Sequence, residues 1–148
     1  LKQRNDDRTS SQRQTRDEDD APDPFEPPQY RGQLDLKQRV LAISTPDDVV
    51  RVLRKRGYKV ERIHDVGATA MDQHYISVRK PPCGGTIILA QYEDAVTKEA
   101  FVKYMSDQGP VVEDGKRVLY VQLTTLHHNA EGQRRCSMPV VEALTAPR

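Results

Sequence analysis

Residues 45–80 constrain the fold of this chain more than any other stretch, because they predict a helix followed by two strands. Thr45 suits the N-cap, where its hydroxyl can accept a hydrogen bond from a first-turn amide. Pro46 fits the first helical position, and Asp48 completes a Thr-x-x-Asp capping box. Gly57 can take the left-handed conformation that ends a helix. The apolar face expected to meet a core consists of Val49, Val52 and Leu53.

Two strands follow at residues 59–66 and 73–80, where β-branched and aromatic side chains are frequent. Prolines and glycines then break the pattern at residues 81–85. The apolar run at residues 86–91 suits either a strand or a helix, because it is too short for its period to decide. An amphipathic helix is expected at residues 92–107, ahead of Gly109 and Pro110.

The last third of the chain predicts one strong strand at residues 117–126, with apolar residues on both faces, as in a central strand. A turn is expected at 110–115, and short helices at 34–43 and 140–144. The expected fold is a small single α/β domain, a mixed β-sheet flanked by helices.

The N-terminal residues differ from the rest in composition. Residues 1–35 carry a net charge of −3 and few large apolar side chains, whereas residues 36–148 carry +4. Such a segment buries too little surface to offset the cost of ordering it, which predicts an extended, Pro-rich tail of the disordered type. Its Pro-rich part is either a linker or a docking peptide anchored by Phe25 and Tyr30.

Two cysteines, Cys83 and Cys136, are too few for a disulfide framework. Pairing stays open, but reduced thiols in a reducing compartment are the favoured interpretation. Neighbouring His127 and His128 would point to opposite faces of a strand, so no metal site is expected there. No metal and no cofactor are predicted elsewhere either.

An acid–base pair on neighbouring strands is conceivable from His64, Asp65 and His74. No nucleophile or third orienting group accompanies these residues. The sequence therefore predicts a protein that is not an enzyme.

Cations cluster strongly around the end of the first predicted helix, with Glu61 as the single acid among them. They form either a solvated helix face or a surface for RNA phosphates. Asp47 and Asp48 are expected to lie too far away to neutralise them. The predicted RNA-binding residues are Arg51, Arg54, Lys55 and Arg56, with Lys59 and Arg62 nearby.

Residues 45–145 resemble the ribosome silencing factor family, also called Iojap, and especially its mitochondrial large-subunit assembly branch. The matching pieces are the helix Val49–Leu53, the strand ending in Asp65–Val66, and Tyr75–Val78. Farther on, the resemblance implies a long helix ending at Gly109, an apolar strand, a strand containing His128 and a last helix. Where the family has an acidic residue before the tyrosine, this chain has His74.

The resemblance implies a factor in the mitochondrial matrix that binds a large-subunit protein at the intersubunit face, in assembly or in blocking subunit joining. Further expected partners are rRNA and other assembly factors, and no membrane. The alternative is a structural subunit of a mitochondrial ribosome or another large organellar complex. The partner-binding residues it suggests are His74, Tyr75, Arg79 and Lys80, with Phe25 and Tyr30 in the tail.

Overall fold

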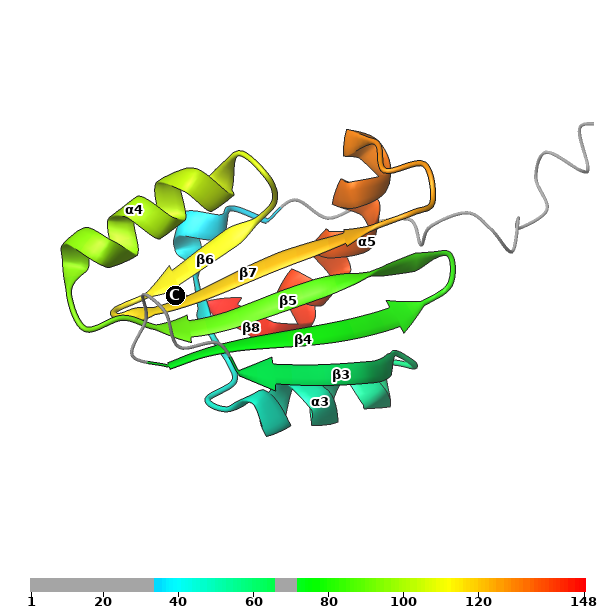
Figure 1. Ribbon diagram of the computed structural model, residues 1–148, viewed down its shortest axis with the longest axis horizontal. Helices are drawn as coiled ribbons and strands as arrows, with labels where there is room; N and C mark the ends of the chain where they lie inside the picture. The colour runs from blue at the N-terminus through cyan, green and yellow to red at the C-terminus, as the bar shows by residue number, and fades with distance from the viewer. Residues whose placement is uncertain (1–33, 66–71) are drawn as a thin grey trace, which may run out of the picture.

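The computed structural model describes residues 34–65 and 72–148 (Figure 1). The predicted tail, with Phe25 and Tyr30, lies outside these residues apart from its last two positions. The described chain forms a small α/β domain, as expected. Its main sheet has the strand order β3-β4-β5-β7-β6. These strands are β3 (Lys59–Asp65), β4 (Asp72–Lys80), β5 (Cys83–Gln91), β7 (Arg117–Thr124) and β6 (Val111–Asp114).

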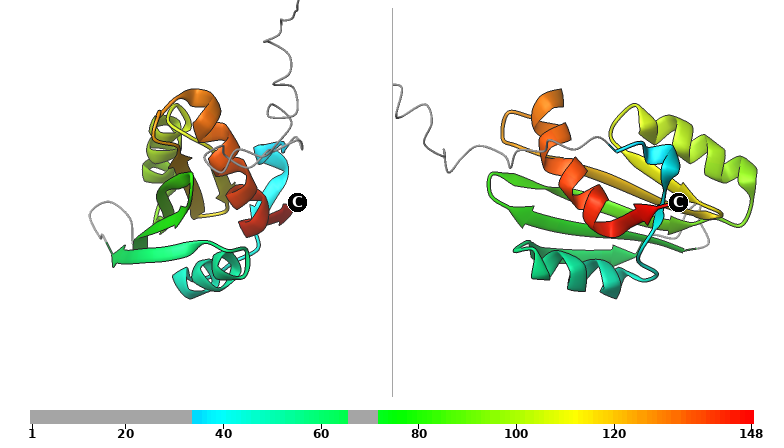
Figure 2. Two further views of the ribbon diagram at one scale, coloured as in Figure 1. Left: turned by 90° about the vertical axis from the view of Figure 1, so that its right-hand side faces the viewer. Right: turned by 180° about the vertical axis from the view of Figure 1, so that it is seen from behind.

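Each pair of neighbouring strands in this sheet is antiparallel, where the sequence suggested a mixed sheet. Helices α3 (Pro46–Lys55) and α5 (Ala130–Leu144) lie on one face of the sheet, and α4 (Ala95–Ser106) lies on the other (Figure 2). Strand β7 lies between β5 and β6, so its apolar residues are buried on both faces. The prediction of a central strand there is confirmed.

The first predicted helix has the ends expected for it. The Thr45 hydroxyl accepts from the Asp48 amide at 3.2 Å, and the Asp48 carboxylate accepts from the Thr45 amide at 3.2 Å. This reciprocal pair is a capping box. Gly57 follows the helix with a φ of 89°, the left-handed conformation predicted for it. Val49 and Leu53, on the apolar face of α3, are fully buried.

The predicted helix at 34–43 is wrong. The chain forms a single 3-10 turn, η1 (Leu36–Gln38), and then strand β2 (Arg39–Leu41), which pairs antiparallel with β8 (Thr145–Pro147). The partner strand comes from the other end of the sequence, so a local pattern cannot show the pairing. The Arg39 side chain reinforces it by donating to the Thr145 hydroxyl at 3.0 Å.

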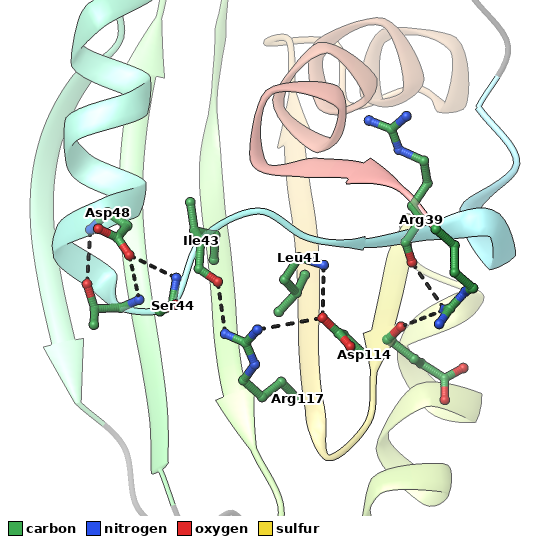
Figure 3. A network of polar contacts seen from close by, with 10 residues as sticks. Arg39, Leu41, Ile43, Ser44, Asp48, Asp114 and Arg117 are labelled. Atoms are coloured by element: carbon green, nitrogen blue, oxygen red, sulfur yellow. Dashed lines mark hydrogen bonds and ion pairs between the residues drawn. The ribbon is translucent and has the colours of Figure 1, made fainter.

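Side chains of the main sheet hold the segment between β2 and α3. Arg117 donates to the Ile43 carbonyl at 2.8 Å, and the Asp114 carboxylate accepts from the Leu41 amide at 3.2 Å (Figure 3). Arg117 and Asp114 also pair with each other at 3.6 Å. Because both residues sit where β6 turns into β7, this network fixes where α3 begins relative to the sheet.

Three other local predictions change. The ambiguous run at 86–91 is a strand, and β5 already begins at Cys83. The expected turn at 110–115 contains β6, whose short length hid it. The expected helix at 140–144 is the end of α5, which begins at Ala130 and contains Pro139.

Residues 130–139 of α5 were missed because their glycine, serine and proline weaken the helical pattern. In the fold these residues serve packing instead. The Ser137 hydroxyl both accepts from the Leu123 amide at 2.9 Å and donates to the Leu123 carbonyl at 3.0 Å. Gly132 lies so close to Thr125 that a Cβ there would come within 2.9 Å of the threonine hydroxyl.

Candidate nucleic-acid interface

Six cationic side chains come from the end of α3, the start of β3 and the end of β4. Lys59 and Arg79 are directly opposite each other in the β3–β4 ladder. The Lys80 ammonium donates to the Arg56 carbonyl at 2.8 Å and lies 5.1 Å from the centre of the Tyr58 ring. These contacts join the helix end to the strand ends. We call this set the basic corner: Arg54, Lys55, Arg56, Lys59, Arg79 and Lys80.

Most charges of the basic corner are open to a partner. Arg54, Lys55, Arg56 and Lys59 are exposed, and within the described part of the chain none of them lies within 4 Å of a carboxylate. Part of this charge stabilises α3 itself, because cations favour the negative end of the helix dipole. The remainder, drawn from three elements, makes a concentrated positive surface.

One acid faces the basic corner. The Glu61 carboxylate pairs with Arg79 at 3.2 Å, and both side chains are roughly half exposed. An exposed ion pair of this kind is worth little, because water screens it and both side chains lose freedom. A phosphate can therefore compete with Glu61 for Arg79.

Arg51, the remaining predicted RNA-binding residue, is paired within α3, and its contact with RNA stays a prediction. Its guanidinium pairs with the Asp48 carboxylate at 2.8 Å, one turn back along α3. The expectation that the acids at the helix start lie too far away is therefore wrong. The Ser44 amide and then Arg51 hold the pKa of the Asp48 carboxyl below its usual value. Asp48 keeps its charge and partly neutralises Arg51.

The four partner-binding residues predicted on β4 separate into two places. Arg79 and Lys80 join the basic corner, next to Arg56. His74 lies near the opposite end of β4, and Tyr75 is half-buried beside the core under α4. Two of the four strand residues, Arg79 and Lys80, thus lie near the end of α3, whereas His74 and Tyr75 do not.

His74 is bound by a carboxylate at each ring nitrogen. Nδ1 lies 2.5 Å from Asp65 Oδ1, and Nε2 lies 2.7 Å from Asp72 Oδ1. Burial lowers the pKa of His74, but the two carboxylates outweigh it, so that the net shift is upward. With both nitrogens occupied, the imidazole is a brace between β3 and β4. The contact with Asp65 was anticipated from sequence, and the second contact, with Asp72, was not.

His127 and His128 lie in the turn after β7 and not in a strand. His128 has a φ of 52°, which only a turn accommodates. No group of three potential metal ligands forms among residues 34–65 and 72–148. The helices in those same ranges also include none that is long and apolar enough to cross a membrane.

Lys59 belonged to the cationic cluster noted in the sequence but not to the four residues predicted to bind RNA. It follows the helix stop at Gly57 by two residues, and the turn at Gly57 returns the chain beside the helix end. A basic residue directly after such a turn is the signal that could have included it. Lys80 was assigned to a different site, and only the fold brings it to Arg56.

The chain matches no protein-family model, no curated protein and no solved structure. Within residues 45–65 and 72–80, the helix and the two strands follow in the expected order, and the expected loop lies outside the described residues. Beyond them the order differs from the one that the silencing-factor resemblance implied. Strand β5 is an additional element, and His128 lies in a turn instead of a strand.

Proposed function

We propose that this protein is a non-enzymatic factor that binds the large ribosomal subunit, with the basic corner against rRNA phosphates. The observation that carries the proposal is that the end of α3, the start of β3 and the end of β4 bring six cations to one corner of the fold, where Glu61 pairs with Arg79 alone. Phosphate binding by lysine and arginine releases condensed counterions, and this release drives association with RNA. The silencing-factor resemblance of residues 45–80 supports the ribosome as the particle that carries the RNA.

The proposed mechanism is occupancy. A factor seated at the intersubunit face, with a large-subunit protein as its second contact, assists assembly or keeps the small subunit from joining. This mechanism requires a shaped, charged surface and no reacting groups. The exposed side chains of α3 and the paired ends of β3 and β4 provide such a surface.

The location that goes with the proposed function is the mitochondrial matrix. Cys83 and Cys136 are joined in a disulfide, against the expectation of reduced thiols. Disulfides persist in oxidising compartments and are rare where thiols are kept reduced. A mitochondrial-matrix location therefore requires both thiols to be reduced there, which differential alkylation of the cellular protein would establish.

The test is co-sedimentation with purified large subunits over a salt series. Neutralising Arg54 and Lys55 to glutamine should reduce the slope of log affinity against log salt by roughly 0.7–0.9 for each lost phosphate contact. The matched control neutralises two exposed cations elsewhere, Lys103 and Arg134. Equal slopes for the wild type and the Arg54/Lys55 variant, or no sedimentation at all, would rule out the proposed contact.

A factor and a structural subunit differ in where they sediment. A factor is expected on free large subunits or their precursors and not on translating monosomes. A structural subunit would stay in both fractions. Gradient fractions of a cell extract, probed for this chain, distinguish the two.

A further inference from the structure

One face of the main sheet is only partly covered. Helix α4 packs over the β6–β7 side, where Phe101, Val102 and Met105 contact the buried rings of Tyr92 and Tyr120. In Figure 1, α4 lies to the left and above, and among the described residues no helix lies in front of β3 and β4. Helices α3 and α5 lie behind the sheet (Figure 2). Among residues 34–65 and 72–148, no helix therefore covers the front of β3, β4 and the adjoining part of β5.

The register shows which side chains share this open front. Ser77 is directly opposite Thr86, and Thr86 is directly opposite Gln122. One row further along the strands, Lys59 is directly opposite Arg79. Residues directly opposite in an antiparallel ladder lie on the same face, and so do alternate residues of one strand. We call this set the polar sheet face: Lys59, Ser77, Arg79, Thr86 and Gln122.

Two ring side chains border the polar sheet face on its other side. Tyr75 lies two residues before Ser77 on β4, hence on the same face, and His64 of β3 is directly opposite it. His64 is exposed and Tyr75 is half-buried. The open front thus has two rings at one margin, three hydrogen-bonding side chains in the middle and two cations at the other margin, where the Glu61 carboxylate pairs with Arg79 at 3.2 Å.

We infer that the polar sheet face binds single-stranded RNA, an inference that rests on the proposed function and names the form of RNA. Bases splayed from a single strand stack on aromatic and histidine rings, here Tyr75 and His64. The hydroxyls of Ser77 and Thr86 and the Gln122 amide can donate to and accept from base edges and ribose. Lys59 and Arg79 bind the phosphates, and both already belong to the basic corner.

The chemistry of the surface selects this occupant over two others. The accessible side chains at the centre of this front, Ser77, Thr86 and Gln122, are polar, whereas the centre of a protein–protein interface is apolar. A duplex stacks its bases inward, so that it offers phosphates to the basic corner but no base to Tyr75. The rings are therefore used only by a single strand.

The experiment measures binding of the full, oxidised chain to a labelled oligouridine strand and to an RNA hairpin duplex at one salt concentration. Tyr75→Ala should weaken oligouridine binding by about fivefold or more, the effect of losing one stacked base. Tyr75→Phe should stay within about twofold, because it keeps the ring. Neither variant should change duplex binding. Tyr104→Ala, which removes an aromatic side chain that is 67% exposed on α4, is the matched control.

Because Tyr75 packs against the core, His64→Ala and Gln122→Ala provide the same test at exposed positions. Thermal melts establish that each variant is folded. Oligouridine binding unaffected by all three alanine variants, or duplex binding weakened equally by them, would overturn the inference. If the three alanine variants lost binding to large subunits but kept oligouridine binding, the face would contact a protein partner. That result would also overturn the inference.

These outcomes separate the inference from the proposed function. Suppose that binding to large subunits depends on Arg54 and Lys55, while oligouridine binding is unchanged by substitutions in the polar sheet face. The inference then fails and the proposed function stands. If oligouridine binds through Tyr75 and large subunits do not bind at all, the proposed function fails.

Discussion

Cys83 at the start of β5 and Cys136 in α5 have Cα atoms 5.6 Å apart, and their sulfur atoms are joined. Both residues are buried, at 2% and 0% exposure. The bond therefore ties the covering helix to a central strand of the sheet, across 53 positions of sequence. It adds a covalent link to the packing of Val140, Val141 and Leu144 against the same core.

Removing this link should destabilise the fold. The double variant Cys83→Ala/Cys136→Ala should lose roughly 2–4 kcal/mol of unfolding free energy, because the unfolded chain regains the freedom that the cross-link removes. Urea denaturation measures the loss. Adding reductant should lower the wild-type midpoint and leave the double variant unchanged. An identical midpoint for the wild type with and without reductant would contradict the prediction.

The His74 brace predicts a stability that falls as pH rises. The folded-state pKa of His74 lies above its ordinary value of 6.5, so the protonated imidazole is favoured by folding. Its contribution is complete below about pH 6.5 and is lost as pH rises through the folded-state pKa. Because Asp65 and Asp72 are exposed, each contact is worth a few tenths to about 1 kcal/mol.

The measurement for His74 is the unfolding free energy across this pH window. His74→Gln should flatten the pH dependence, while His127→Gln, at an exposed turn position, should leave it as in the wild type. If His74→Gln and the wild type gave parallel curves, the brace would have no energetic role.

Two neighbouring glycines of β5 should differ sharply on substitution. A Cβ at Gly85 would collide with the Gln122 carbonyl oxygen and come within 2.9 Å of Leu123 Cα, both of them backbone atoms. Gly85→Ala should cost about 1–3 kcal/mol or more, because β5 and β7 must separate to admit it. At Gly84 the nearest atom would be 3.6 Å away, so Gly84→Ala should change stability by less than about 1 kcal/mol. Chemical denaturation of both variants compares them directly; equal losses would refute the close approach.

The N-cap of α3 should be worth a measurable amount by itself. Thr45→Ala removes the acceptor of the Asp48 amide and should cost about 0.5–2 kcal/mol. Thr45→Ser keeps the hydroxyl and should stay close to the wild type. Thermal melts followed by circular dichroism distinguish the two variants. An alanine variant as stable as the serine variant would mean that water accepts the hydrogen bond of the Asp48 amide equally well.

Local interactions made part of the fold predictable. The boundaries of α3 follow from Thr45, Asp48 and Gly57, because a capping box and a left-handed stop act within a few residues. The apolar residues on both faces of the run at 117–126 likewise indicated a central strand, and the density of cations near the end of α3 indicated a basic surface there.

Long-range packing decided the rest. Strand β2 exists because the chain's other end supplies β8, and α5 persists through Pro139 because its buried side chains pack on the sheet. The same holds for the surface: Arg51 is partly neutralised by Asp48, and Lys80 joins Arg56 only because β4 ends beside α3. The sequence by itself determined the elements whose stabilising contacts lie within a turn or a strand. Tertiary structure decided which distant elements meet, because that depends on burial and pairing between residues that no local pattern relates.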